Sequence, residues 1–440
     1  MKSRILKIEY PDKNIQKVQI VTFDDWNKLR FLSPVFNERA FEQFVYIYRN
    51  NMVDAFPFIF GNVVLFYLPD ECSFEYEADE KKYGKITDKL TRATILLKEG
   101  VRFIKRQPHF LNNTSKELYE YLEERGCLKT AFGKLNTTKI VPVGKKAGFL
   151  TETNKEAALK VNSSFFIMDF IDTATVFDQV GEPFGLMVKD GKIICPPLYE
   201  REALIVRNGK VEIRKVSLSE LRIFIKDEEL KGTTYCRPMY KVTPSGSKDI
   251  VIIGNKVVCV KNNGNSEIPA SGFVIKVNED VNVNPGDEVT YSGMEEVSFA
   301  LQVGNSLIID GKKTERFISR FYDFKKPGIS YPPSLYPLNF KKSRAPRIAL
   351  GADKDNRPMI IWAEGAGKYG HEKGKESSGV SLREMSEICQ IVNMHNGINL
   401  DGGGSAQILI RNKRKLKISD RDRYSFEEKE RAVPIGLVIY

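Results

Sequence analysis

The chain has few of the residues that build metal centres. Its 440 residues include only three histidines, His109, His371 and His395, and six cysteines that form no CxxC pair. Zinc sites usually gather histidines and cysteines at short, regular spacing, so the sequence predicts no metal site and we expect no cofactor. Irregularly spaced cysteines in a chain of this length favour buried free thiols over a disulfide framework.

Long apolar runs are also missing. No stretch of about 18 apolar residues occurs, which argues against a membrane span. The start of the chain, Met1–Tyr10, has no apolar core of signal-peptide length and is typical of a first strand. We therefore expect a cytoplasmic protein, or a secreted one if a leader was removed before this numbering begins.

The charge of the chain is strongly positive, at +11. A positive field attracts anions, and both nucleic acids and phosphorylated sugars fit that description, although many lysines serve only solubility. Residues 1–138 contain no DNA- or RNA-binding motif, so a nucleic-acid partner is not expected. The sequence does not indicate an oligomeric state.

The pattern of the chain predicts two domains and an α+β fold. Residues 1–138 alternate strand-like stretches, such as 18–22 and 62–67, with helix-like ones, and a capping box at 114–117 predicts a helix. We interpret 1–138 as an N-terminal α+β domain of unknown role. Residues 139–440 predict a mainly β domain with few helices.

Two kinds of signal support that mainly β domain. Asp-Gly and Asn-Gly pairs between apolar runs predict hairpin turns, because tight turns need positive φ angles; they occur at 190–191, 208–209 and 310–311. A single helix is well marked, because a capping box at 381–384 precedes apolar residues at helical spacing up to Val392.

The segment Asn399–Ser405 contains three consecutive glycines between two strand-like stretches. Such a run is costly in chain entropy and indicates a backbone with unusual dihedral angles or a close approach to another group. Successive backbone N–H groups there can bind an anion, and Asp401 enters the turn from a strand end. A flexible loop with a turn aspartate is the competing interpretation, since short glycine motifs are unspecific.

This segment resembles the NLDGGGS signature of the phosphodiester glycosidase family. Other segments resemble the family's motifs in the same order, namely 162–166, 184–191, 268–273, 344–355, 362–365, 379–385 and 431–434. The resemblance therefore covers about 140–440. The chain departs from the family pattern where Ser163 and Ser164 replace two glycines, Ile348 replaces a threonine and Glu364 replaces an aspartate.

The resemblance implies a hydrolase that cleaves a glycosyl phosphodiester, a sugar-1-phosphate linkage, or a related sugar-phosphate or nucleotide conjugate. A departing phosphate needs cationic or N–H stabilisation, and a carboxylate is needed to activate water or stabilise the sugar cation. We assign catalytic roles to Asp401, Glu364 and Arg347. The expected substrate-binding residues are Arg431, Gly402, Gly403, Gly404, Ser405, Asn162 and Asn399.

The expected partner is a small molecule or glycan that carries phosphate. The alternative function is a non-catalytic module that binds a phosphorylated sugar or nucleotide in the same anion pocket. The departures from the family pattern motivate that alternative.

Overall fold

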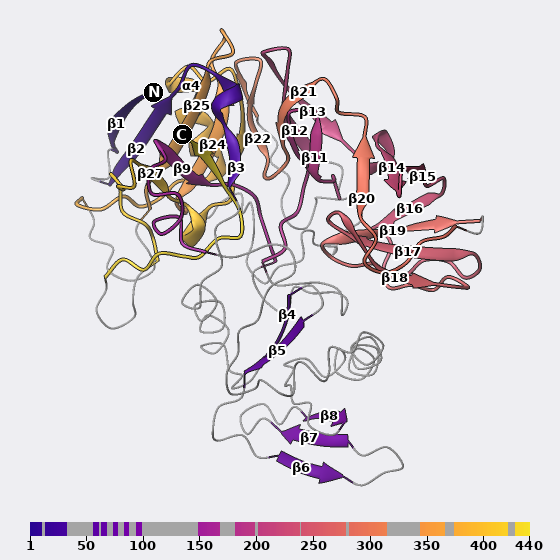
Figure 1. The fold of residues 1–440 in the computed structure, drawn as a ribbon. Coiled ribbons are helices and arrows are strands. Elements are labelled where there is room, and N and C mark those ends of the chain that lie inside the picture. Colours follow the sequence, from indigo (N-terminus) through magenta and orange to yellow (C-terminus); the bar gives the residue numbers. More distant parts are fainter. Residues whose placement is uncertain are drawn as a thin grey trace.

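A computed structural model shows how the chain folds (Figure 1). It describes residues 1–10, 14–32, 148–167, 181–198, 201–237, 239–278, 281–314, 344–365, 374–420 and 427–440, and the backbone of five strands between residues 56 and 98. The helix predicted from 114–117 and the predicted boundary at 138/139 lie outside these residues, so both stay predictions.

A seven-stranded sheet is the largest unit of the fold. It contains, in spatial order, β1 (Lys2–Glu9), β2 (Ile15–Thr22), β25 (Pro358–Ala363), β24 (Arg347–Ala352), β26 (Asn396–Asn399), β22 (Ser306–Ile309) and β23 (Lys312–Lys313). Its pairing is antiparallel throughout the described strands, and Val18 of β2 pairs with Ala363 of β25.

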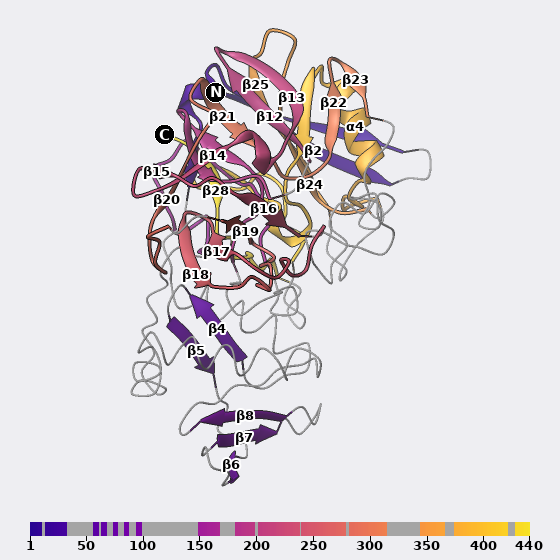
Figure 2. The ribbon, with the colours of Figure 1, turned by 90° about the vertical axis from the view of Figure 1, so that its right-hand side faces the viewer.

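Helix α4 (Leu382–Ile391) covers one face of this sheet (Figure 2). Successive strand residues point to opposite faces, so β24 sends Ala349 toward the helix and Ile348 and Leu350 toward the other side. The helix begins at the predicted capping box, where Ser381 and Glu384 bond reciprocally, and its apolar stripe packs on the sheet. The predicted helix is confirmed.

The opposite face of the seven-stranded sheet joins the main core, to which four further sheets contribute. One contains β11 (Lys192–Cys195), β10 (Met187–Lys189), β21 (Val297–Leu301), β12 (Arg201–Arg207) and β13 (Lys210–Val216); another contains β27 (Ile408–Ile410), β9 (Leu159–Asn162), β28 (Gly436–Ile439) and β3 (Arg30–Leu32). All three predicted hairpin turns join paired strands and have positive φ angles.

Two smaller sheets lie on the other side of the molecule, at the right of Figure 1. They contain β15 (Glu228–Glu229), β14 (Arg222–Ile225) and β20 (Val289–Ser292), and then β16 (Thr233–Cys236), β19 (Gly272–Val277), β17 (Lys248–Ile253) and β18 (Lys256–Lys261). Short 3-10 helices occupy Trp26–Lys28 (η1), Leu218–Glu220 (η3) and Gly403–Ser405 (η4). The remaining strands pair locally as β4 (Phe56–Phe60) with β5 (Val63–Tyr67), and as β6 (Phe74–Glu77), β7 (Tyr83–Thr87) and β8 (Thr94–Lys98).

The predicted α+β fold class, with an N-terminal α+β domain, is wrong. Strands dominate the described residues, which contain one α-helix. The described N-terminal strands β1 and β2 extend the seven-stranded sheet, and β3 pairs with β28 near the C-terminus. Pairing across such distances in the sequence is set by burial in a shared core, which local periodicity does not reveal.

Two further properties concern the described residues alone. Among them, no helix has the length and apolar character needed to cross a membrane. Their four cysteines, Cys195, Cys236, Cys259 and Cys389, form no disulfide with one another.

Candidate functional site

The triple-glycine bend, defined as residues 400–407, connects β26 to β27 and lies against the start of β24. The Leu400 N–H donates to the Ile348 carbonyl at 2.8 Å, and the Gly403 N–H donates to the Pro346 carbonyl at 2.9 Å. Because β24 is a central strand of the sheet, these bonds fix the bend to the middle of the sheet.

Close contacts or an unusual backbone angle explain why each of the three positions is occupied by glycine. A Cβ on Gly402 would lie 2.8 Å from the Pro346 carbonyl oxygen, and Gly403 has a φ of +59°, which L-residues rarely adopt. A Cβ on Gly404 would come within 2.3 Å of the Arg431 guanidinium and the Asp420 carboxylate. The bend is therefore shaped for close packing, and the interpretation as a flexible loop does not describe it.

Asn162 and Ser163, which lie at the end of β9, hold the bend from the other side. The Asn162 side chain donates to the Asp401 carbonyl at 2.8 Å and accepts from the Gln407 N–H at 3.0 Å. The Asp401 N–H donates to the Ser163 carbonyl at 3.0 Å. Asn162 therefore braces both ends of the bend, and its amide is occupied by the backbone.

Asp401 is the most electrostatically unusual group of the bend. Its side chain is buried, and burial raises the pKa of its carboxyl from 3.8 to about 7. The Ser405 hydroxyl, the positive charge of Arg431 and the Gly402 N–H act in the opposite direction and lower this pKa. Asp401 is thus a carboxyl that changes its protonation state near neutral pH.

Arg431 supplies the positive charge next to that carboxyl. Its Nε donates to Asp420 Oδ2 at 2.9 Å, its Nη2 lies 2.8 Å from the same oxygen, and the pair packs against Gly404. Both side chains are only partly exposed. The guanidinium is therefore fixed in place, as phosphate recognition by a planar fork requires.

Arg347 begins β24 and lies beside the bend, since a Cβ on Gly402 would be 3.9 Å from its Cα. The guanidinium is buried, and its Nε donates to the Val380 carbonyl at 2.8 Å. Burial lowers the pKa of Arg347 to about 10, whereas the charge of Glu384 raises it. Arg347 is therefore charged at neutral pH and adds a second cation to this end of the sheet.

Glu364 follows β25, so β24 separates it from Asp401, and the two Cα atoms lie roughly 10 Å apart at normal strand spacing. One Glu364 oxygen accepts from the Ser377 hydroxyl at 2.5 Å and the other accepts from the Lys417 N–H at 2.8 Å. The Lys17 ammonium is 3.9 Å away. Each oxygen of Glu364 therefore has a partner within the protein.

The other predicted ligand residues of the bend are buried as well. The Asn399 side chain donates to the Leu400 carbonyl at 2.7 Å, and Ser405 is fully buried beside Asp401. Two of the three glycine N–H groups are used inside the protein, by the Asp401 carboxylate for Gly402 and by the Pro346 carbonyl for Gly403. The glycine N–H groups that were predicted to bind an anion are therefore partly engaged in bonds that hold Asp401 and the bend.

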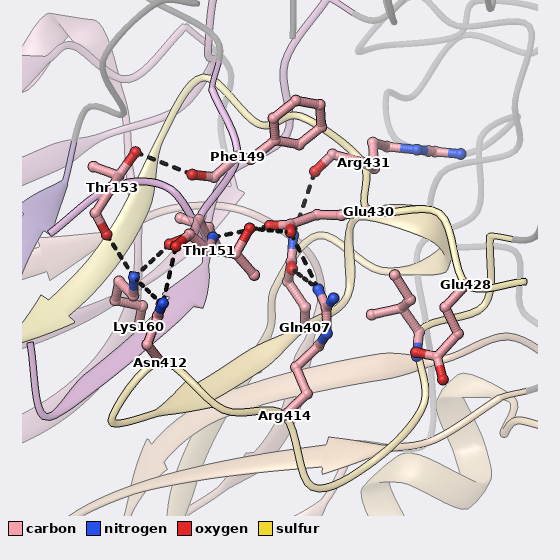
Figure 3. A network of polar contacts seen from close by, with 12 residues as sticks. Phe149, Thr151, Thr153, Lys160, Gln407, Asn412, Arg414, Glu428, Glu430 and Arg431 are labelled. Carbon is pink, nitrogen blue, oxygen red and sulfur yellow. Dashed lines mark hydrogen bonds and ion pairs between the residues drawn. The ribbon is translucent and has the colours of Figure 1, made fainter. Parts of the chain in front are cut away.

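A polar network behind the bend links β9, β27 and the C-terminal segment (Figure 3). The buried Lys160 ammonium donates to the Leu150 and Thr153 carbonyls and to the Asn412 side chain, and burial lowers its pKa. Glu430 accepts from Thr151 and lies 3.3 Å from Arg414.

The same network reaches the site through Gln407. Its amide accepts from Arg414 at 3.1 Å and donates to the Arg431 carbonyl at 3.3 Å. The Arg431 side chain extends away from these contacts (Figure 3). The network therefore fixes the backbone from which Arg431 reaches the bend.

The structure brings Asp401, the three glycines, Ser405, Asn162, Asn399 and Arg431 together, with Arg347 alongside, whereas the Glu364 carboxylate is held in separate contacts. The sequence analysis did not identify Asp420, which orients Arg431. Asp420 lies in a charged stretch between 411 and 431, where no local pattern distinguishes one acid from another. Among the described residues, no group of three or more His, Cys, Asp or Glu is arranged to hold a metal ion.

Comparison with known proteins gives a match for the part of the chain that contains the triple-glycine bend, Arg347 and Arg431. Residues 236–440 match the family model described as phosphodiester glycosidase. None of the curated proteins matches the chain.

Two solved structures are similar to the chain at low identity. A hypothetical protein from Synechocystis is 13% identical with a TM-score of 0.39, covering 100% of this chain and 76% of its own. The catalytic domain of zebrafish N-acetylglucosamine-1-phosphodiester alpha-N-acetylglucosaminidase, auto-inhibited by its pro-peptide, is 12% identical with a TM-score of 0.34, covering 96% of this chain and 88% of its own. TM-scores this low do not inform the function of the chain.

Proposed function

We propose that the protein is a hydrolase that cleaves a glycosyl phosphodiester, because residues 236–440 match the phosphodiester glycosidase family model. The substrate is a sugar joined through its anomeric oxygen to a phosphate that bears a second group, as in a nucleotide sugar or a phosphorylated glycan. The observation that carries the proposal is the buried Asp401 carboxyl, with a pKa of about 7, next to the fixed charge of Arg431.

The two arginines suit the charge that this reaction develops. As the bond between the anomeric carbon and oxygen breaks, negative charge grows on the departing phosphate, and a preorganised guanidinium stabilises it. Arg431 is held by Asp420, and Arg347 adds a buried charge beside Gly402. A phosphate leaving group requires less proton donation than a sugar alcohol does, so cations take the place of a strong general acid.

Asp401 acts in its ionised form. The carboxylate accepts a proton from water while the water oxygen attacks the anomeric carbon, and the phosphate leaves with the electron pair of the broken bond. The products are the free sugar and a phosphate monoester, to which the proton passes either from Asp401 or through solvent. A carboxyl with a pKa near neutrality is well matched to accepting and then releasing that proton.

Glu364 takes a positioning role in this proposal. Its two oxygens accept from Ser377 and from the Lys417 N–H, which leaves the carboxylate engaged with the protein. It stabilises the end of β25 next to the start of β24, from which Arg347 projects.

The test is incubation with a panel of nucleotide sugars and sugar-1-phosphodiesters, with products followed by phosphorus NMR. Turnover that Asp401→Asn abolishes supports the proposal. The matched control is Asp249→Asn, because Asp249 is also a buried aspartate but bonds to Thr243 and Lys276 in the β16–β19 sheet. In ¹⁸O-labelled water, the label is expected in the sugar; label in the phosphate product would mean that the phosphorus–oxygen bond is cleaved.

A non-catalytic binding module is the second candidate, favoured by the internal use of the Gly402 and Gly403 N–H groups and by the Arg431–Asp420 pair. Saturable binding of the same compounds without products would support it. The cytoplasmic location stays a prediction from the sequence.

A further inference from the structure

Four buried polar side-chain atoms around the bend have no hydrogen-bond partner within the described part of the chain. One is the Ser405 hydroxyl, which lies beside the Asp401 carboxyl and lowers its pKa. The other three are the hydroxyl oxygens of Ser163 and Ser164 and the side-chain oxygen of Asn399. The three residues are 0%, 2% and 2% exposed, respectively. Buried polar groups are almost always paired in folded proteins, so a local concentration of exceptions calls for an explanation.

These atoms belong to the segments that enclose Asp401. The Ser163 carbonyl accepts from the Asp401 N–H, Ser164 is the next residue, and Asn399 precedes Asp401 by two positions. Among the other described buried serines, the Ser266 hydroxyl also has no partner, whereas two further ones are bonded within the protein. The Ser377 hydroxyl donates to Glu364, and the Ser386 hydroxyl donates to the Leu307 carbonyl.

We infer that Ser163, Ser164 and Asn399 are specificity-determining residues that recognise hydroxyl groups of the substrate's sugar. This inference rests on the proposed function and names the part of the substrate to which these residues bind. It also assigns ligand recognition to Ser163 and Ser164, which the sequence analysis did not include among the binding residues.

The chemistry of the three atoms matches a sugar ring. A serine hydroxyl both donates and accepts, whereas the Asn399 oxygen only accepts. A ring hydroxyl has the same dual capacity, so it can donate to Asn399 while accepting from a serine. Asp401, Arg431 and Arg347 are charged and suit the anomeric centre and the phosphate, which leaves the neutral atoms for the remaining hydroxyls.

Such an arrangement discriminates strongly between ligands. A buried polar atom that meets its partner only when the ligand binds penalises an analogue that lacks the hydroxyl. The neighbouring backbone stays ordered because Asn162 and Ser163 already bond to the bend.

The first arm of the test measures stability without ligand. Ser163→Ala and Ser164→Ala are expected to leave the melting temperature unchanged or to raise it, because each removes a hydroxyl without a partner. The matched control Ser386→Ala is expected to lower it, because that hydroxyl is bonded to Leu307. A lower melting temperature in both Ser163→Ala and Ser164→Ala would overturn the inference.

The second arm measures binding of glucose 1-phosphate, galactose 1-phosphate, UDP-glucose and UDP-N-acetylglucosamine by calorimetry. The wild type is expected to bind at least one probe, and each serine variant to bind it about 10-fold more weakly. The wild type is further expected to lose affinity for a deoxy analogue of that probe, whereas the double variant Ser163→Ala/Ser164→Ala discriminates less. Ser386→Ala keeps the wild-type dissociation constant.

The inference is overturned if the wild type binds none of the probes, or if wild type and serine variants bind equally. The second result would mean that internal water alone satisfies these hydroxyls. Binding without turnover would instead contradict only the proposed hydrolysis, so the two failures are distinguishable.

Discussion

Two buried carboxylates follow the strands on either side of β24, and they are held in different ways. Glu364 follows β25 and has a hydrogen-bond donor on each oxygen, with Lys17 nearby. Asp401 follows β26. Burial raises the pKa of its carboxyl to about 7, because it outweighs the lowering effects of Ser405, Arg431 and Gly402. The difference shows that burial alone does not assign a role.

The surroundings of Glu364 and Asp401 differ in how well hydrogen-bond donors compensate for burial of the carboxylate. Around Glu364, a donor from the protein meets each oxygen of the carboxylate. Around Asp401, the Ser405 hydroxyl, the charge of Arg431 and the Gly402 N–H do not offset burial, so the pKa is raised to about 7 and the protonation state can change during a reaction. The following predictions test this comparison, from the largest expected effect to the smallest.

Asp401→Asn is expected to reduce kcat by about 10³-fold or more, because the proton acceptor is lost while the shape of the side chain is retained. Steady-state kinetics on the best substrate of the panel measures this. Asp249→Asn, the buried aspartate outside the site, is expected to retain kcat. Equal losses in both variants would mean that activity only follows stability.

Arg431→Met is expected to reduce kcat by about 10²- to 10³-fold through loss of phosphate stabilisation. The variant also removes a charge that lowers the pKa of Asp401, so that pKa rises further. Because the ionised form is active, the acidic limb of the pH–rate profile is expected near pH 7 in the wild type and at higher pH in the variant. A limb that does not move would contradict the electrostatic link between the two residues.

Gly404→Ala and Gly403→Ala form a matched pair within the bend. A methyl group on Gly404 meets Arg431 and Asp420 at 2.3 Å, so we expect a loss of about 1–3 kcal/mol in stability with a clear loss of activity. Gly403→Ala meets open space but keeps a positive φ, which costs only about 1–2 kcal/mol. Chemical unfolding and kinetics check both, and greater loss of activity in Gly403→Ala would contradict the close packing of Arg431.

The pH dependence of the free energy of unfolding of Asp401→Asn provides a further test. The folded pKa of Asp401 lies above the unfolded value of 3.8, so its stabilising contribution is complete below that value and is lost as the pH rises through about 7. The variant lacks this dependence, so its stability relative to wild type should improve from about pH 4 to about pH 8 by a few kcal/mol. Urea unfolding at both pH values measures it, and a flat difference would argue against the raised pKa.

Glu364→Gln is expected to have the smallest effect on kcat, about threefold or less, because it disturbs only contacts with Ser377, Lys417 and Lys17. Its free energy of unfolding should fall by about 1–3 kcal/mol. Thermal melts and kinetics on the same sample separate the effect on stability from the effect on kcat. A loss of kcat as large as that of Asp401→Asn would restore Glu364 to a catalytic role.

Local features of the fold were predictable from the sequence, and its long-range pairing was not. The capping box at Ser381 and the Asp-Gly and Asn-Gly turns act through a few adjacent residues, and the structure confirms them. The sheet that joins β2 to β25 depends on a shared core, so the α+β prediction failed there. The charged stretch that contains Asp420 likewise gave no local signal for its bond to Arg431.

Carbon NMR titration of protein labelled at aspartate carboxyls tests the central claim most directly, with Asp401→Asn identifying the resonance. The account predicts one aspartate carboxyl that titrates near pH 7, disappears in Asp401→Asn and shifts to higher pH in Arg431→Met. An Asp401 resonance that titrates close to the ordinary aspartate value of about 4, with or without Arg431, would contradict it.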